Sequence, residues 1–422
     1  MVHGNTGQVN QRTYDDRARL TTDTVSGVSA LSYGYDGANN VKSFGDQLAP
    51  SSNRTTSYDK VDRLLTATAP GLWGSASYAY DALGNRTAET VAGVATDYTY
   101  DNHNRLDTSR RKPSMRPLLL VWDAAGRLAS SSDGTQYLYD GHDRRVRKSS
   151  TYVGCFPAAN ASSATVLVAN NASVTACLQA ASAGSYSVAG LTAGGTCKAL
   201  TGIPSYPDES LCNLSCTAKN TDVCGGATAL SVFSTAPEET LYHYDLGGHI
   251  IAETRPDGSK LRDYIYLAGK LRVVDGCLNS GPCTERERCH TDHLGTVFAR
   301  TDSAGNVAAR FQHKPWGERV SAAVSTSADG DRQYNGRVFH SGTGFHDYGA
   351  RLYWPEIGRF VSADTYSGTI EKPASLNRYS NVLNNPHKYV DTDGRDPVQC
   401  RILERPVSYG YLERSGLADP ML

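Results

Sequence analysis

Short runs in which tyrosine alternates with small or polar residues recur along the first third of the chain, as in YAYDALGNR and YTYDNHNR. Alternation places both tyrosines of a pair, such as Tyr78 and Tyr80, on the same face of an extended strand. The aspartate that follows begins a turn, in which Gly84 can take a positive φ, and Arg86 starts the return strand. This pattern predicts β-hairpins with one tyrosine-lined face.

The Tyr-Asp step recurs at roughly 20-residue intervals, which marks a repeat architecture. It stands at Tyr14, Tyr35, Tyr58, Tyr80, Tyr100 and Tyr139, with Trp122 in a variant unit. A single hairpin cannot bury its own sheet face, so neighbouring repeats supply one another's core. We therefore predict an all-β protein in which the tyrosines pack and the aspartates accept hydrogen bonds from local backbone amides.

Composition changes abruptly between Tyr152 and Ser234, where no Tyr-Asp unit occurs and alanine, serine and threonine dominate. The cysteines of this insert are Cys155, Cys177, Cys197, Cys212, Cys216 and Cys224. An even, dense set is typical of a small domain held together by disulfides. A zinc site would need paired Cys-x-x-Cys knuckles, which the insert lacks, so we predict no metal there.

Tyrosine alternation resumes after the insert, in YHYDLGGHIIAETRPDGSKLRDYIYL, so the insert interrupts the repeats without ending them. Cys277 and Cys283 flank a Gly-Pro turn in this second block, and we expect a local disulfide between them. Cys289 and Cys400 have no evident partner. The chain is thus predicted to divide into repeats at 1–151, the insert at 152–234, repeats at 235–333, a closing segment at 334–394 and a tail at 395–422.

The closing segment carries four marks in a fixed order: DYGARLYWPEIGRF, then Asp364, then NRYSNVLNNP, then VDTDG. They closely resemble the Rhs-repeat-associated core, and the Tyr-Asp units resemble the YD repeats of bacterial Rhs proteins, insecticidal toxins and animal teneurins. The resemblance implies an all-β hollow shell of spiralling hairpins that the core closes. It also implies an expected partner, which is further repeats of the same shell upstream of this chain.

The same resemblance implies the only catalytic chemistry that we predict. In bacterial relatives the core cuts its own chain with two aspartates, and matching by motif places Asp364 and Asp391 at those positions. The cut then falls between Arg395 and Asp396, and Arg359 is expected to hold one carboxylate ionised. Two carboxylates that share a proton supply both a base toward water and an acid.

The match departs from the family at three positions. Thr365 and Thr392 follow the aspartates where relatives have proline, and Arg395 stands where they have leucine. The alternative is that the aspartates only cap turns, as the Asp-Gly step at 393–394 suggests. From the sequence, cleavage and capping both remain open.

The insert has the landmarks YVGCF, ACLQAA, GGTCKA, CNLSC and VCGGATALSVFS, which are similar to the WSC domain. That family carries two further cysteines, at the places of Ala181 and Ala199, and we expect the two losses to belong to one vanished disulfide. The resemblance implies a polysaccharide or cell-surface glycan as partner. The candidate stacking residues are Tyr152, Tyr186 and Tyr206, although Tyr152 could equally belong to the core.

Glycosylation sequons stand at Asn160, Asn171 and Asn213, with others at Asn53 and Asn85. They predict surface loops in a host that glycosylates.

Charge and composition restrict the remaining functions. The formal net charge of −1 argues against a general nucleic-acid binder, and the absence of a run of about 18 apolar residues argues against a membrane span. The first residues lack the apolar stretch of a signal peptide, but ten cysteines indicate an oxidising compartment, so we expect a secreted or surface location. The HTDH run at 290–293 is better explained as a strand and turn than as a metal site, and no cofactor is predicted.

Three hypotheses therefore stand. The favoured one is a secreted or surface-displayed shell protein that binds glycans through its insert. The second is a self-cleaving remnant of a polymorphic toxin that uses the aspartate pair. The third is a gene fragment without function.

Overall fold

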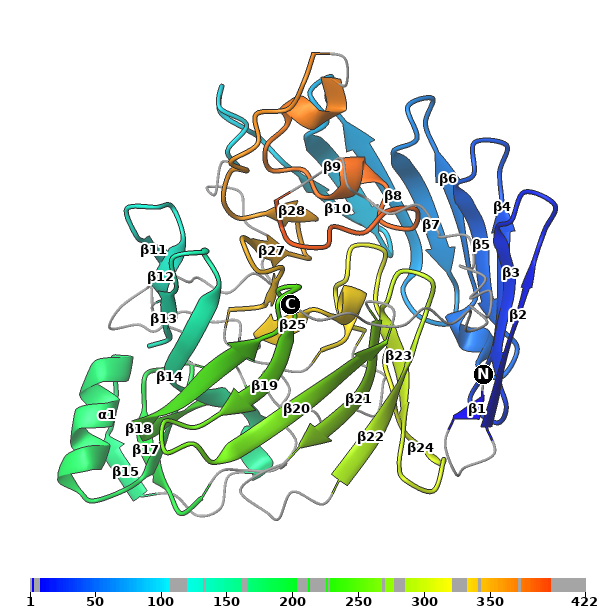
Figure 1. The fold of residues 1–422 in the computed structure, drawn as a ribbon. Helices are drawn as coiled ribbons and strands as arrows, with labels where there is room; N and C mark the ends of the chain where they lie inside the picture. The colour runs from blue at the N-terminus through cyan, green and yellow to red at the C-terminus, as the bar shows by residue number, and fades with distance from the viewer. Residues whose placement is uncertain are drawn as a thin grey trace, which may run out of the picture.

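The computed structural model describes residues 2–3, 8–106, 120–131, 134–160, 165–202, 212, 225–226, 228–267, 270–276, 285–320, 332–340, 343–370 and 373–395. Its regular structure is almost entirely antiparallel strand, arranged in three sheets (Figure 1). Among the described residues α1 (Val174–Ala183) is the one α-helix. The predicted all-β fold is confirmed, with a helix in the insert that the sequence pattern did not predict.

The first sheet is a meander of ten strands, each paired with the next along the chain. Its strands are β1 (Val2–His3), β2 (Gln8–Tyr14), β3 (Leu20–Val25), β4 (Ser29–Tyr35), β5 (Val41–Asp46), β6 (Arg54–Tyr58), β7 (Leu64–Ala69), β8 (Gly74–Tyr80), β9 (Arg86–Val91) and β10 (Val94–Asp97). The short 3-10 helix η2 (Pro50–Ser52) joins β5 to β6. The strands β2, β4, β6 and β8 each end at the tyrosine of a Tyr-Asp step, as predicted.

The second sheet repeats this meander and also carries the insert. Its path is β11 (Leu120–Trp122), β12 (Leu128–Ser131), β13 (Gln136–Tyr139), β14 (Arg145–Pro157), β18 (Ala229–Tyr244), β19 (Ile250–Thr254), β20 (Lys260–Leu267), β21 (Lys270–Gly276), β22 (Glu285–Thr291), β23 (Val297–Thr301) and β24 (Val307–Arg310). The insert adds η4 (Ala158–Asn160), β15 (Thr165–Val168), β16 (Val188–Leu191) and β17 (Cys197–Leu200).

A small third sheet lies between the two large ones. It is made of β25 (Val338–His340), β26 (Phe345–Asp347), β27 (Leu352–Trp354) and β28 (Arg359–Phe360), with η6 (Tyr334–Gly336), η7 (Pro373–Leu376) and η8 (Val382–Asn384) beside it. Phe345 packs with Leu128 of the second sheet, and Ile357 packs with Tyr98 of the first-sheet block. We call the segment 332–395 the core segment.

Each repeat turn is held by its aspartate. In the turn after β6, Oδ1 of Asp59 accepts the backbone N–H groups of Val61 and Arg63 at 3.0 and 2.9 Å, and Oδ2 accepts Nε–H of Arg63 at 2.7 Å. Asp62 takes the left-handed conformation, with φ at 66°. The same two backbone bonds recur at Asp15, Asp36, Asp81, Asp101, Asp123, Asp140 and Asp302. The predicted turn-capping role of these aspartates is confirmed.

The tyrosine before each aspartate ties its strand to the preceding repeat. Tyr80 on β8 donates its hydroxyl to the carbonyl of Leu64 on β7 at 2.8 Å, and Arg63 lies over its ring at 4.9 Å. The same hydroxyl bond occurs in the pairs Tyr35–Leu20, Tyr58–Val41, Tyr100–Arg86, Tyr139–Leu128 and Tyr244–Arg145. This bond fixes the register between successive repeats, because it joins the end of one strand to the start of its neighbour.

The insert grows out of a single repeat hairpin. β14 and β18 pair along their length, from Arg147 opposite Leu241 at the shell end to Pro157 opposite Ala229 at the insert end. Tyr244, which follows the insert, still donates to the carbonyl of Arg145, at 2.7 Å. The repeat pattern is therefore continuous across the insert.

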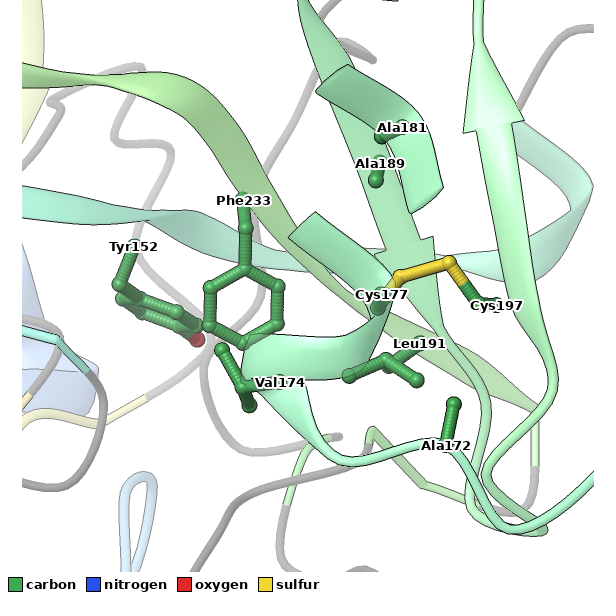
Figure 2. Packing of buried hydrophobic residues seen from close by; sticks show 9 residues of the cluster. All are labelled: Tyr152, Ala172, Val174, Cys177, Ala181, Ala189, Leu191, Cys197 and Phe233. Carbon is green, nitrogen blue, oxygen red and sulfur yellow. A yellow bond between two sulfur atoms is a disulfide. The ribbon is translucent and has the colours of Figure 1, made fainter. Parts of the chain in front are cut away.

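The insert has a small hydrophobic core of its own, in which α1 packs against β16 and β18 (Figure 2). Ser173 caps the helix by accepting the N–H of Ala176 at 3.2 Å. One disulfide joins Cys177 to Cys197 and another joins Cys155 to Cys212.

Most of the remaining cysteines cannot be assigned to a disulfide or a free thiol, because they lie outside the described residues. Cys216, Cys224, Cys277, Cys283 and Cys400 lie outside the described residues. Cys289 on β22 is a buried free thiol.

The helix-to-strand disulfide generates a test of the two lost cysteines. Ala181 lies one helical turn beyond Cys177, and Ala199 lies two strand residues beyond Cys197, so the two steps have similar lengths of about 6 Å. Both alanines are buried. We expect Ala181→Cys with Ala199→Cys to form a bridge spontaneously and to stabilise the fold by on the order of 3 kcal/mol in urea unfolding. Two more free thiols in the oxidised double variant than in the wild-type chain, counted by mass after unfolding and alkylation, would show that the positions do not face each other.

Candidate functional site

One guanidinium lies against both predicted aspartates. Nη2 of Arg351, in the turn between β26 and β27, is 2.8 Å from Oδ2 of Asp364 and 3.5 Å from Oδ2 of Asp391. All three side chains are at least nine-tenths buried, and the ring of Phe360 covers the guanidinium at 3.7 Å. The structure thus brings together two aspartates that are separated by 27 residues in the sequence.

The other nitrogens of Arg351 hold backbone carbonyls. Nη1 donates to the carbonyl of Arg378 at 2.9 Å, and Nε donates to the carbonyl of Gly394. Arg378 in turn donates Nε–H to the backbone carbonyl of Asp364 at 2.6 Å. The guanidinium therefore links both aspartates to the peptide that leads into the predicted cut.

Each aspartate also caps a turn with its other oxygen. Oδ1 of Asp391 accepts the N–H groups of Asp393 and Gly394 at 3.1 and 2.7 Å, and Oδ1 of Asp364 accepts the N–H of Tyr366 at 2.9 Å. Gly394 has φ at 78°, and a Cβ there would lie 3.1 Å from the backbone nitrogen of Arg351. The turn-capping alternative is correct for one oxygen of each carboxylate, and the second oxygen faces Arg351.

Burial changes the protonation of the pair. Burial raises the pKa of Asp391 to about 6, although the charge of Arg351 and the two backbone bonds act to lower it. Burial also raises the pKa of Asp364, again against the charge of Arg351. Near neutral to mildly acidic pH the site can therefore hold one ionised and one protonated carboxyl group, as acid–base chemistry requires.

Arg359, the predicted partner of the aspartates, has other contacts. It donates to Oδ1 of Asn85 at 2.6 Å and to the carbonyl of Asn104 at 2.8 Å, and it lies over the ring of Tyr100 at 4.6 Å. Arg359 therefore joins the core segment to the repeats, and Arg351 takes the place that we predicted for it. The sequence alone did not identify Arg351, although it lies inside the DYGARLYWPEIGRF mark, because that mark carries both arginines and the one that meets the aspartates is set by tertiary contacts.

The core segment docks on repeat turns that lack the usual arginine. Asn40 and Asn85 stand where Arg19 and Arg63 stand in neighbouring turns, four residues after the aspartate. Asn385 donates to Oδ1 of Asn40 at 2.9 Å. The shorter amide leaves space for the core segment at these turns.

Two further asparagines complete this contact. Asn377 donates to Oδ1 of Asn85 at 2.8 Å, and Asn384 donates to the carbonyl of Gly84 at 2.8 Å. The NRYSNVLNNP mark is therefore a set of amides that bind the shell, which positions Asp364 and Asp391 on either side of it.

Of the three tyrosines predicted to stack on a glycan, one is buried and another lies outside the described residues. Tyr152 is only 7% exposed and packs against Phe233 with ring centroids 5.4 Å apart, so it belongs to the core of the insert and its predicted stacking role is not supported. Tyr186 is half-buried against the same cluster, and Tyr206 lies outside the described residues.

The sequons differ in their exposure. Asn171 is exposed, Asn53 is also exposed, and Asn85 is buried under Arg359, so Asn85 is not a surface acceptor. Asn160 ends η4, and Asn213 lies outside the described residues.

No helix in the described part of the chain has the length and apolar character to cross a membrane. In the HTDH run, Oδ1 of Asp292 caps a turn by accepting the N–H groups of Leu294 and Thr296, both at 2.9 Å. This agrees with the strand-and-turn interpretation of that run.

Comparison with known families identifies the insert. The model of the WSC domain matches residues 152–226. The two disulfides described above lie within that range.

Comparison with curated proteins finds several relatives of this chain. The chain is 29% identical over 157 residues to the tRNA3(Ser)-specific nuclease WapA of Bacillus spizizenii, 33% over 111 residues to double-stranded DNA deaminase toxin A of Burkholderia cenocepacia, and 34% over 100 residues to toxin subunit YenC2 of Yersinia entomophaga. These matches cover 37%, 25% and 23% of this chain. They cover only 6%, 7% and 10% of the relatives, so the chain spans a small part of their length.

Comparison with solved structures identifies the fold. The crystal structure of TcdB2-TccC3-Cdc42 matches with a TM-score of 0.59 at 17% identity, over 93% of this chain and 18% of that chain. The Photorhabdus luminescens Tc holotoxin pore matches over 95% of this chain with a TM-score of 0.57. The resemblance to Rhs and YD-repeat shell proteins, with an inserted WSC domain, is thereby confirmed.

The pKa of Asp391 generates a test of the site by pH. A carboxyl group whose pKa is about 6 when folded, against the ordinary value of 3.8, keeps its proton longer in the folded state. Its contribution to stability is therefore fully present below about pH 4 and is lost as the pH rises through 6. We expect Asp364→Asn to lose on the order of 2 kcal/mol of unfolding free energy between pH 4 and pH 7 through this group, and the Asp364→Asn/Asp391→Asn double variant to lack that loss. Parallel urea-unfolding curves for the two variants over this range would contradict the assignment.

Proposed function

We propose that this chain is the closing part of an Rhs-type shell that cuts its own backbone between Arg395 and Asp396, releasing the segment that follows. The observation that carries the proposal is the pair of buried carboxyl groups on Arg351, beside the carbonyl of Gly394. Buried carboxyl groups with raised pKa values are costly to a fold and are characteristic of acid–base sites.

The proposed reaction is hydrolysis by one water molecule. Asp364, closest to Arg351, is the ionised carboxylate and takes a proton from water, whose hydroxyl adds to the carbonyl carbon of Arg395. Asp391, with the pKa of about 6, gives its proton to the leaving nitrogen of Asp396 as the C–N bond breaks. Water is the only co-reactant, and the products are a carboxyl group and an amine.

Arg351 has a positioning role in this scheme. Its Nε–H holds the carbonyl of Gly394, and its Nη2 holds both carboxyl groups, so that the peptide and the acid–base pair share one rigid support. Two relatives are a toxin and a toxin subunit, which supports release of a segment as the purpose of the cut.

Intact mass measured during cell-free synthesis tests the proposal. We expect the full chain to convert to a body that ends at Arg395, and Asp364→Asn or Asp391→Asn to slow this conversion by about 100-fold or more. The matched control is Asp302→Asn, which removes a carboxylate that caps a repeat turn in the same way after β23. The mass also locates the cut, since a break after Gly394 differs by one arginine. Persistence of the full-length chain under wild-type conditions between pH 5 and pH 7 would rule out the proposal.

A second function concerns the insert. We infer that the WSC domain binds a polysaccharide or cell-surface glycan and that the protein works outside the cell. The family match over 152–226 supports the first inference, and the two disulfides support the second. Of the aromatic residues that we predicted for this role, Tyr186 is described and half-buried.

Retention on insoluble β-glucan tests this inference. We expect the full chain to be retained, and Tyr186→Ala to weaken retention by several-fold because a stacked ring contributes about 1 kcal/mol or more. Tyr366→Ala, which removes an exposed tyrosine of the core segment, is the matched control. Equal elution of wild-type protein from β-glucan, chitin and an uncharged agarose column would leave the insert without a glycan role.

A further inference from the structure

Arg395 is held in three ways. Its backbone N–H donates to Oδ1 of Asp393 at 2.9 Å. Its side chain leaves the core segment and reaches a repeat turn, where Nη2 donates to Oδ2 of Asp143 at 2.7 Å and to the carbonyl of His142 at 3.4 Å. The residue that borders the proposed cut is thus fixed at both its backbone and its side chain.

The carboxylate of Asp143 is itself held in place. Asp143 lies in the turn between β13 and β14 and has φ at 61°, the left-handed conformation of this turn position. Its other oxygen, Oδ1, accepts Nη1–H of Arg127 at 2.9 Å. Arg127 also forms an ion pair with Asp123, at 2.7 Å, so its positive charge is already balanced by that carboxylate. The negative charge of Asp143 is therefore balanced by Arg395.

This charge is not required by the turn. The same position is Asn39, Asp62, Gly84 or Asn104 in other repeats, and Asn39 accepts a bond from Arg19 at 3.1 Å much as Asp143 accepts one from Arg127. An amide or no side chain therefore satisfies the repeat. The carboxylate at 143 adds only an ionic partner for the core segment.

We propose that Asp143 is a positioning residue that selects a basic side chain at 395 and so sets the specificity of the self-cleavage. The inference rests on the proposed function, and it adds a contact that lies outside the aspartate pair. Arg351 holds the carbonyl of Gly394 on one side of residue 395, and Asp143 holds the side chain of 395 itself. The bond between 395 and 396 then directly follows an anchored residue.

The chemistry of the cut is unchanged by this contact. Water still adds its hydroxyl to the carbonyl carbon of Arg395. Asp364 takes the proton from water, and Asp391 gives its proton to the leaving nitrogen. Asp143 acts before that step, by reducing the number of conformations in which the bond lies away from the carboxyl groups.

A double-mutant cycle measures the selection. Asp143→Asn keeps an oxygen acceptor for Arg127 but removes the charge, and we expect it to slow conversion by about 3- to 5-fold, the range of a partly exposed ion pair. Arg395→Leu should slow conversion similarly and should make the rate insensitive to Asp143→Asn. The reversed pair, Asp143→Lys with Arg395→Glu, should be faster than either of its single changes. Arg105→Gln, which breaks an exposed ion pair on another turn, should leave the rate unchanged.

The results separate the two proposals. If the wild-type chain is cut and Asp143→Asn slows the wild-type chain and the Arg395→Leu variant equally, the selection is overturned while self-cleavage stands. If the wild-type chain stays intact, self-cleavage falls, and selection of the cut falls with it.

Trypsin then decides whether the contact itself exists. In the Asp364→Asn chain, which should remain uncut, an Arg395 side chain bound to Asp143 cannot enter the protease at the same time. We expect Asp143→Asn to increase the rate of trypsin cleavage after Arg395 by several-fold. Mass spectrometry of the 1–395 product measures this rate. Equal rates in the two chains would overturn the contact.

Discussion

The carboxylate that closes each repeat turn is the interaction on which the rest of the molecule depends. One aspartate oxygen accepts two backbone N–H groups that would otherwise be unpaired at the turn, and bonds of this charged kind contribute about 1.5–3 kcal/mol each. The turn fixes where the next strand begins, and the tyrosine hydroxyl then fixes its register, as in Tyr80 and Leu64. The core segment uses a related device at Asp391, whose Oδ1 accepts the N–H groups two and three residues on instead of two and four. The candidate site therefore contains a turn capped by an aspartate whose second carboxylate oxygen faces Arg351.

Electrostatics explain why this inward turn differs from the others. On the shell surface, Asp59 has an arginine of its own, Arg63, at 2.7 Å. Inside, Asp364 and Asp391 share the single charge of Arg351, which also serves two carbonyls. Burial raises the pKa of both carboxyl groups against this charge, whereas hydrogen bonds from Arg19 and Arg105 lower the pKa of Asp15 and Asp101 on the shell surface.

The repeats were predictable from sequence because their signal is local. Tyr-x-Tyr-Asp sets the strand face, the turn and its cap within a few residues, and the strands that end at Tyr58 and Tyr80 follow directly from it. The aspartates of the site were identified by family motif, but their arginine was assigned to Arg359 instead of Arg351. That choice depends on which guanidinium turns inward, and this is decided by docking on Asn85, a residue 274 positions away. Likewise, α1 was missed because a ten-residue helix is too short to be stable by itself and depends on a serine cap and a disulfide.

The long strands β14 and β18 have a mechanical consequence. They run from the shell into the insert as one hydrogen-bonded ribbon, with no flexible linker on either side in the described part of the chain. A load applied to the insert is therefore carried into the shell as shear along that ribbon, and it has to break several ladder bonds together before it reaches the turn aspartates. The ribbon also fixes the orientation of the insert relative to the shell. Attachment of the insert to a polymer would therefore orient the whole shell relative to the surface that bears the polymer.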